Sequence, residues 1–257
     1  NALEKIFVVP VTLNYNFVLE APSLISQFLK MQGQERYYIE NDEYSTSYKI
    51  SAFLFKFFTK GSHISVSIGK AMDVLGNYVD NEGNSYDKKG RTIDTQEYFT
   101  QDGRIISHNQ QREDEYTRML SNRIVEEFHR INKIFASHLV AFTAFEILKK
   151  RYKKLDLYNL LRLPEEDLYI SNEEFLKVFK VLLEKVLKLH EEDEVGISPY
   201  LRASAEEVID HGLANVGMYH AKRPLIKTKE GNLTTEDLNL LFYYHNRLVG
   251  YKLEEYV

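Results

Sequence analysis

Residues 6–15, IFVVPVTLNY, place a strongly apolar, β-branched run near the start of the sequence. From Ile6 to Leu13 the run does not alternate with polar residues, a pattern typical of a strand covered on both faces in a parallel or mixed sheet. The other strand pattern nearby is His63–Gly69, in which apolar and polar residues alternate. Two strands alone do not make a stable sheet. We therefore expect further strands, on a segment upstream of Asn1.

Most of the remaining chain has helical periodicity. One helix is predicted at Ala21–Met31, and the second half of the chain carries several more. The order of these patterns predicts an α/β fold class, with the end of an α/β core in residues 1–110 and a mainly helical C-terminal subdomain in residues 111–257. Asn172 is the predicted N-cap of one helix, and Thr234 or Thr235 that of the last. The helices predicted in the second half cover residues 114–131, 137–152, 172–193, 203–215 and 235–248.

Residues 73–102 are rich in Gly, Asn and Asp, which predicts turns and short hairpins. The spacing of Asp80, Glu82 and Asn84 matches that of the first ligands in a calcium-binding loop. Ser85, however, stands where that loop requires glycine. This segment is therefore interpreted as a turn. Residues 230–232 predict a second hairpin turn. No repeat of fixed period is apparent.

The composition excludes several kinds of function. The 257-residue chain has 44% apolar residues, ample for a core, and its net charge of −5 does not suggest a nucleic-acid partner. Cysteine is absent, which excludes disulfides, thiolate nucleophiles and cysteine metal sites. The longest apolar runs fall short of the roughly 18–20 residues that cross a bilayer. Any membrane contact is therefore expected to be peripheral.

Several segments, in order, carry a family resemblance. The strand VVPVTLNY resembles the fourth sequence block of the glycerolipid acyltransferases, in which a Val-Pro-Val strand ends near a tyrosine beside the active site. The following segments have the same order: AMDVLGNYVDNEGNSYDKKGRTIDTQEYF, REDEYTRMLSNRIVEEFHRINKI, SHLVAFTAFEILKK, LYNLLRLPEEDLYI and LLFYYHNRLVGYKLE. Together they resemble the C-terminal half of a bacterial glycerol-3-phosphate or 1-acylglycerol-3-phosphate acyltransferase, over nearly the whole chain.

The resemblance implies a reaction and a location. A fatty acyl group would pass from acyl-coenzyme A (acyl-CoA) or acyl carrier protein to glycerol 3-phosphate or its 1-acyl derivative, in phospholipid synthesis. The protein would act as a peripheral protein at the cytoplasmic face of the membrane, with no metal ion or other cofactor. In that family a histidine, followed at the fifth position by aspartate, removes the hydroxyl proton. A block containing Pro-Glu-Gly helps to hold the phosphate.

Neither motif is present in this chain. None of the eight histidines is followed at the fifth position by aspartate, and no Pro-Glu-Gly occurs. We therefore assign no catalytic residue, and we expect the catalytic half to lie on a missing N-terminal segment and this chain alone to be inactive. Thr12 and Tyr15 are either substrate-side groups or ordinary strand residues. The substrate-binding residues carried over from the fourth block are Val9, Pro10, Val11, Thr12 and Tyr15.

Residues 48–59, YKISAFLFKFFT, predict an amphipathic helix with an apolar stripe flanked by lysines. Such a helix suits either a membrane surface or packing on the sheet. Packing is the commoner use of such a stripe, and we favour it here.

Two other functions stay open. The helical half, residues 111–257, is alternatively a non-catalytic interaction or dimerisation module, which would make the protein a homo-oligomer. The third possibility is a hydrolase that uses His138 or His220, but no sequence motif supports it. Ser137, which precedes His138, is predicted to cap a helix. The C-terminal aromatic residues would form either a contact surface or core: Phe242, Tyr243, Tyr244, Tyr251 and Tyr256.

Overall fold

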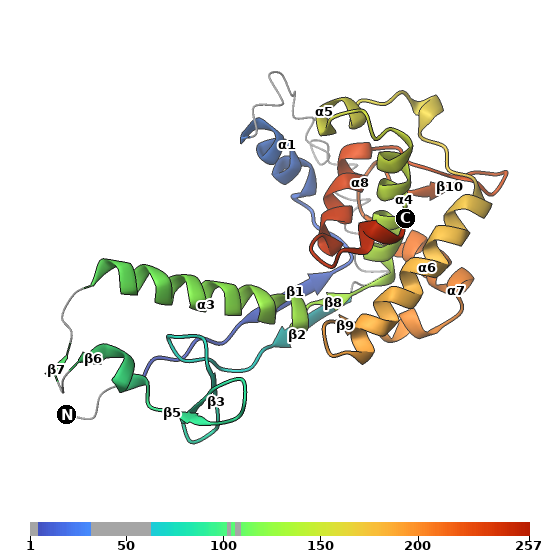
Figure 1. Ribbon diagram of the computed structural model, residues 1–257. Coiled ribbons are helices and arrows are strands. Elements are labelled where there is room, and N and C mark those ends of the chain that lie inside the picture. Colours follow the sequence, from blue (N-terminus) through green and yellow to red (C-terminus); the bar gives the residue numbers. More distant parts are fainter. Residues whose placement is uncertain (1–4, 32–62, 102–103, 106–108) are drawn as a thin grey trace, which may run out of the picture. The chain divides into compact units, whose positions relative to one another are not determined.

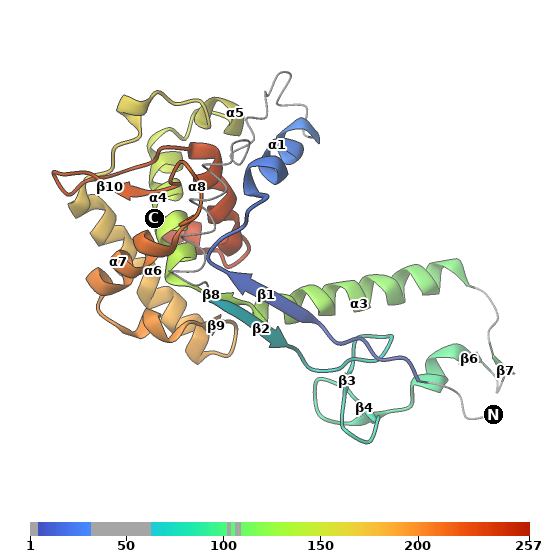
Figure 2. The same ribbon diagram turned by 180° about the vertical axis from the view of Figure 1, so that it is seen from behind.

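The computed structural model describes residues 5–31, 63–101, 104–105 and 109–257. It is a mixed α/β structure in which helices predominate and strands are few and short, as the sequence predicts (Figures 1 and 2). The chain forms two compact units. Unit 1 comprises Asn1–Leu13 and Val66–Asn132, and unit 2 comprises Asn14–Ser65 and Lys133–Val257. The compact boundaries thus differ from the division at residue 110 expected from the sequence.

Helix α4 (Ala136–Arg151) is the centre of unit 2 (Figure 1). Every residue from Ala136 to Leu148 is buried. The helix is apolar around most of its circumference, so it needs cover on all sides. The prediction of a helix at residues 137–152 is confirmed. The covering helices are α6 (Asn172–Glu191), α7 (Ala205–Asn215) and α8 (Leu238–His245), and α1 (Ala21–Met31) packs on α8.

The helix starts follow the rules of N-capping, but two predicted caps were wrong. Ser171 caps α6, because its Oγ accepts the backbone N–H of Glu174, so the cap lies one residue before Asn172. Asp237 caps α8 through the N–H of Leu240. Thr235 instead accepts the N–H of Asp237, so the threonine supports the cap rather than forming it.

Short elements complete unit 2. The hairpin predicted around residues 230–232 is confirmed, and Gly231 takes a positive φ of 89° in its turn. The parallel pair of β8 and β9 joins the start of α4 to the segment that follows α6. These elements are β8 (Lys133–Ile134), α5 (Leu157–Leu160), η2 (Glu165–Asp167), β9 (Gly196–Ile197), η3 (Pro199–Arg202), β10 (Ile226–Lys227), β11 (Leu233–Thr234), η4 (Asn246–Leu248) and η5 (Leu253–Tyr256).

Residues 73–93 of unit 1 contain a seven-residue repeat that the sequence analysis missed. The segments DVLGNYV, DNEGNSY and DKKGRTI each place aspartate first and glycine fourth. The three glycines, Gly76, Gly83 and Gly90, have φ values of 83°, 80° and 78°, which glycine adopts without strain. The repeat builds a three-stranded antiparallel meander of β3 (Tyr78–Val79), β4 (Ser85–Tyr86) and β5 (Thr92–Ile93).

The aspartates hold these turns. In each copy one carboxylate oxygen accepts the backbone N–H groups two and four residues ahead, at 2.8–3.0 Å. The N–H of Asn84 leads the hydrogen bonds that lower the pKa of Asp80 to about 2. The interpretation of this segment as a turn is confirmed. In a fourth copy, beginning at Asp94, Glu97 replaces the glycine, and the chain forms the 3₁₀ helix η1 (Thr95–Phe99) instead. The short pair β6 (Thr100–Gln101) and β7 (Arg104–Ile105) follows.

Helix α3 (Gln110–Ile131) is fastened to unit 1 by the buried carboxylate of Glu127. This carboxylate accepts hydrogen bonds from the backbone N–H of Lys70 at 2.9 Å, the Tyr78 hydroxyl at 3.2 Å and the Arg130 guanidinium. Burial alone would raise the pKa of Glu127, but the bonds from Arg130 and Lys70 outweigh it and lower the pKa. A Cβ at Gly69 would lie 2.8 Å from Oε1 of Glu127, so this approach requires glycine.

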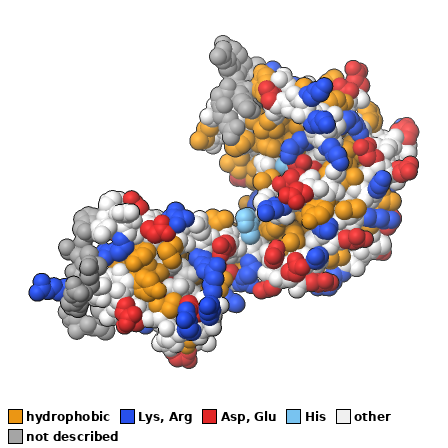
Figure 3. Space-filling view, viewed as in Figure 1, with side chains coloured by type: hydrophobic (Ala, Val, Ile, Leu, Met, Phe, Trp, Pro, Cys, Tyr) orange, Lys and Arg blue, Asp and Glu red, His pale blue; other side chains and the backbone are white. Residues whose placement is uncertain are grey.

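Apolar burial differs between the units. Both hydrophobic clusters found among the described residues belong to unit 2. In the described part of unit 1, Met72 and Leu75 are the buried apolar residues besides proline. Helix α3 leaves Met119, Val125 and Phe128 exposed, and an orange apolar area lies beside this helix in Figure 3. Unit 1 therefore has little core of its own.

We predict that Gly212→Ala destabilises unit 2. A Cβ at position 212 of α7 would lie 2.6 Å from Cγ1 of Val140 and 2.7 Å from the carbonyl oxygen of Ala136. Overpacking of this kind costs about 1–3 kcal/mol, more than the roughly 1 kcal/mol that alanine gains over glycine in a helix. Urea denaturation followed by circular dichroism measures the difference. The exposed substitution Asp210→Ala on the same helix is the control and should not lower stability. A more stable Gly212→Ala variant would contradict the close approach.

Candidate functional site

Four of the predicted substrate-binding residues lie in unit 1, on or just before β1 (Val11–Tyr15). Val9 and Val11 are 46% and 47% exposed, whereas Pro10 is buried and Thr12 half-buried. Oγ1 of Thr12 donates a hydrogen bond to the carbonyl oxygen of Ile131 at 3.3 Å. The side chains thus alternate between an open face and a covered face, and they do not converge on one point.

Tyr15, the fifth predicted residue, belongs to unit 2 and is half-buried. It packs against the small cluster of Val18, Ala21 and Leu240, and the guanidinium of Arg247 lies 5.2 Å from the centre of its ring. Such contacts stabilise the end of β1. A substrate role for Thr12 and Tyr15 stays a prediction.

One face of β1 is open, which contradicts the sequence-based prediction. The predicted strand at residues 6–13 was expected to be covered on both faces, but β1 begins at Val11 and pairs only with β2 (Ile64–Ile68) among the described strands. The two arrows run in opposite directions in Figure 2. The alternate residues along both strands are half-buried or buried, so the exposed residues share one face, and no described segment covers that face. This apolar ribbon face consists of Val9, Val11, Leu13, Val66 and Ile68 in unit 1.

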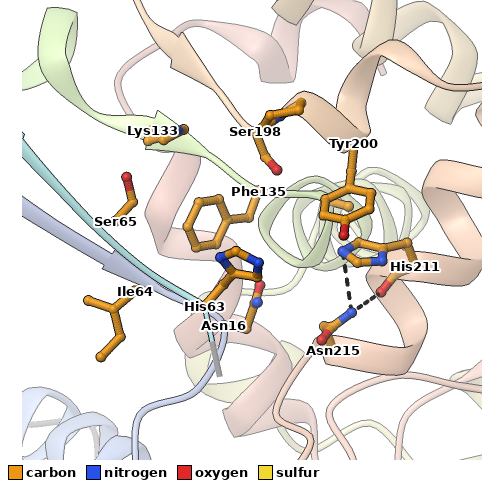
Figure 4. Close-up of a pocket in the computed structure, with 12 residues that line it drawn as sticks. Asn16, His63, Ile64, Ser65, Lys133, Phe135, Ser198, Tyr200, His211 and Asn215 are labelled. Carbon is orange, nitrogen blue, oxygen red and sulfur yellow. Dashed lines mark hydrogen bonds between the residues drawn. The ribbon is translucent and has the colours of Figure 1, made fainter. Parts of the chain in front are cut away.

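A pocket of about 960 Å³ lies in unit 2 (Figure 4). Its walls come from segments far apart in the sequence: the end of β1, the start of β2, β8, the start of α4, η3 and α7. Pockets of this size accommodate small-molecule ligands. None of the five predicted substrate-binding residues lines it, although Asn16 follows Tyr15 directly. The lining residues are Asn16, His63, Ile64, Ser65, Lys133, Phe135, Ala136, Ser198, Pro199, Tyr200, His211 and Asn215.

Two buried polar side chains of the pocket have unused hydrogen-bonding capacity. Asn16 is 7% exposed, and its Oδ1 accepts a 2.6 Å hydrogen bond from Oγ of Ser137. Its Nδ2 has no partner among the described residues. Ser198 is 9% exposed, and its hydroxyl, which makes no cap hydrogen bond, points between Phe135 and Tyr200 (Figure 4). Neither atom is fully enclosed, so both are accessible to a bound molecule or to water.

His211 is held in one orientation. Its ring stacks on Tyr200 with the ring centres 4.0 Å apart. The side-chain amide of Asn215 donates to the carbonyl oxygen of His211 at 2.8 Å and lies 3.4 Å from its Nε2. Burial and the neighbouring His63 lower the pKa of His211, which favours the neutral ring. With Nε2 as the acceptor, the proton of this neutral ring is on Nδ1.

His138 and His220 are buried outside the pocket and have hydrogen-bond partners within unit 2. Nδ1 of His138 accepts the N–H of Phe135 at 3.3 Å, so Nε2 carries the proton and faces the carbonyl oxygen of Tyr15 at 3.4 Å. His220 lies 3.0 Å from the hydroxyl of Tyr244. His138 therefore supports the start of α4, and the predicted cap, Ser137, was wrong because its hydroxyl binds Asn16 instead.

The C-terminal aromatic residues mainly belong to the core: Phe242 and Tyr244 are buried, while Tyr256 is 43% exposed beside Lys185. The helix predicted at residues 48–59 lies outside the described residues. No described helix has both the length and the apolar character needed to span a bilayer. Within the described part of the chain, no group of three or more metal-binding side chains comes together.

Comparison with protein-family models, with curated proteins and with solved structures found no match to this chain. The site must therefore be interpreted from its own geometry. The pocket was missed by sequence reasoning because its lining residues come from distant segments, and none stands in a local motif.

We predict that His138 makes the stability of unit 2 depend on pH. Burial, and secondarily the positive charge of Arg247, lower its pKa to about 3, below the ordinary value of 6.5. The unfolded chain therefore takes up a proton as pH falls through about 6.5, while the folded chain stays neutral. This contribution to stability is fully present above pH 6.5 and decreases by about 1.4 kcal/mol per pH unit down to about pH 3.

The measurement compares the wild type with His138→Gln, which retains hydrogen-bonding groups but does not titrate. Urea unfolding at pH 7, 6 and 5 should show a smaller loss of stability in the variant. Equal slopes for the wild type and His138→Gln would contradict the prediction.

Proposed function

We propose that this chain is the C-terminal part of a peripheral-membrane glycerolipid acyltransferase, which moves a fatty acyl group from acyl-CoA or acyl carrier protein to glycerol 3-phosphate or its 1-acyl form. The observation that carries the proposal is the apolar ribbon face, which includes Val9 just before β1 and Val11 at its start. The order of the segments that resemble this family supports it further.

The apolar ribbon face needs a partner that continues a sheet. Leu13, Val66 and Ile68 are 55%, 58% and 71% exposed. Fully burying one such side chain contributes about 1.5–3 kcal/mol, so covering this face would rival the net stability of a whole domain. A two-stranded sheet is also marginal by itself, and its outer edges offer unpaired backbone groups. The proposed occupant is therefore the remaining α/β core of the enzyme, on a segment outside these 257 residues.

The same segment would supply the chemistry. A histidine with its aspartate would take the proton of the glycerol hydroxyl as the oxygen bonds to the thioester carbonyl carbon. The carbon–sulfur bond then breaks, the acyl ester forms, and the proton passes to the departing thiol. His138 and His220 are not suited to this step, because both are buried and hydrogen-bonded within unit 2. In this proposal Val9 and Val11 pack beneath the acyl-transfer site, and Tyr15 lies at the end of β1 beside it.

We predict that the apolar ribbon face is essential in the complete gene product. Val11→Asp and Val66→Asp should each lower acyl transfer by at least tenfold, because each places a charge where the α/β core would pack. The assay follows free thiol release from acyl-CoA with glycerol 3-phosphate and with its 1-acyl derivative. Val249→Asp is the matched control: Val249 is 54% exposed in unit 2, and its replacement should leave activity unchanged.

The chain of 257 residues should show no acyl transfer when assayed alone. Activity of this chain equal to that of the complete gene product would overturn the proposal, and so would full activity of both Val11→Asp and Val66→Asp. Light scattering tests the alternative occupant, a second copy of the chain. A complete gene product that is inactive in acyl transfer, and whose dimer is disrupted by Val11→Asp, would favour the dimerisation module instead.

A further inference from the structure

We propose that the pocket of unit 2 binds the oxyanion group of a small molecule, a phosphate or a carboxylate, whose apolar body packs on the aromatic wall. This inference goes beyond the proposed acyl transfer, because the pocket uses none of the five residues predicted on β1. It stands whether or not the chain belongs to an acyltransferase.

The polar side chains of the pocket are suited to bind an acceptor. Nδ2 of Asn16 and the hydroxyl of Ser198 are donors on side chains that are more than nine-tenths buried, and neither has a protein partner among the described residues. Both donor atoms keep some accessible surface, so a bound molecule can reach them. An oxyanion bound in the pocket would accept a hydrogen bond from either group. Ser198 is also fixed by its backbone N–H, which donates to the carbonyl oxygen of Ile134 at 2.8 Å.

The charged side chain that lines the pocket is positive, which suits an anionic ligand. Lys133 lies on one wall, and the imidazole rings of His63 and His211 lie on others, whereas no aspartate or glutamate is among the described residues that line the pocket. Hydrogen bonds to a charged acceptor are about twice as strong as those between neutral groups. A cation would instead find no carboxylate, and the described residues include no metal-binding group of three.

The remaining walls suit an apolar or aromatic body. Phe135 stacks on His138 with the ring centres 5.1 Å apart, and Tyr200 is locked against His211. Ala136 and Pro199 add apolar surface. Because these residues are held by helices α4 and α7 and by η3, the pocket is already formed and little ordering cost remains on binding. Its volume exceeds the needs of a bare anion, which is why an aromatic anion is the appropriate probe.

Binding to the 257-residue chain tests the proposal by isothermal titration in chloride buffer. Phenyl phosphate and benzoate are the two anionic probes, inorganic phosphate tests the anion alone, and benzylamine is a matched cation with the same ring. We expect saturable binding of at least one aromatic anion at one site, weaker binding of inorganic phosphate, and no binding of benzylamine. Because this chain should not catalyse acyl transfer, the result is independent of the proposed function.

Three variants locate the binding. Ser198→Ala removes a donor, Lys133→Gln removes a positive charge, and Asn16→Asp replaces a donor by a carboxylate of the same shape. Each should weaken binding of the preferred anion by fivefold or more, while Lys153→Gln, an exposed lysine outside the pocket, should not. Circular dichroism and urea unfolding identify any variant that fails to fold, and Ser198→Ala, the smallest change, keeps the test decisive.

Two results would overturn the proposal. One is the absence of saturable binding for both phenyl phosphate and benzoate. The other is binding that benzylamine matches, or that none of the folded variants weakens. Tighter binding of phenyl phosphate would identify the oxyanion as a phosphate, and tighter binding of benzoate would identify it as a carboxylate.

Discussion

The burial of helix α4 is the constraint on which the rest of unit 2 depends. A helix that is apolar on all sides must be covered on all sides, and α6, α7 and α8 provide that cover. The close packing of Gly212 against Ala136 shows how little free space the contact leaves. Polar groups on α4 must therefore find partners inside the protein. Glu146 does so with His245, at 2.7 Å, in a buried pair that ties α4 to α8.

The same constraint shapes the pocket. Ser137 and His138, on the first turn of α4, bind the side chain of Asn16 and the backbone of Tyr15. These bonds hold the chain just after β1 against the helix and fix Asn16 in the wall of the pocket. On the opposite wall, the pairing of β8 with β9 positions Ser198. The donors of the pocket are thus consequences of satisfying polar groups around a buried helix.

Unit 1 is held by different forces. Its order comes from hydrogen bonds: aspartates that bind backbone N–H groups in successive turns, and the Glu127 carboxylate that joins α3 to the loop after β2. Its apolar side chains, in contrast, are largely on the outside, including the apolar ribbon face. Hydrogen bonds give a unit its geometry but contribute only about 1 kcal/mol each, so they do not replace a core. This imbalance is the physical reason for proposing that unit 1 completes a larger α/β body.

The sequence by itself determined the local structure. Periodicity placed helices α1, α3, α4, α6, α7 and α8, and alternation placed β2, because side-chain spacing repeats within one element. It also contained the Asp-x-x-Gly repeat at Asp73, Asp80 and Asp87, a signal present at fixed spacing and overlooked. The caps at Ser171 and Asp237 lay within one to three residues of the predicted ones.

Only the tertiary structure decided which surfaces are covered and which side chains meet. The run at residues 6–13 has the composition of a doubly covered strand, yet cover depends on neighbours that no strand specifies by itself. Asn16, Ser198 and His211 form one pocket although long stretches of chain separate them, and no local pattern marks any of them. Such contacts arise from the packing of whole elements, a property of three-dimensional complementarity that residue spacing along the chain does not encode.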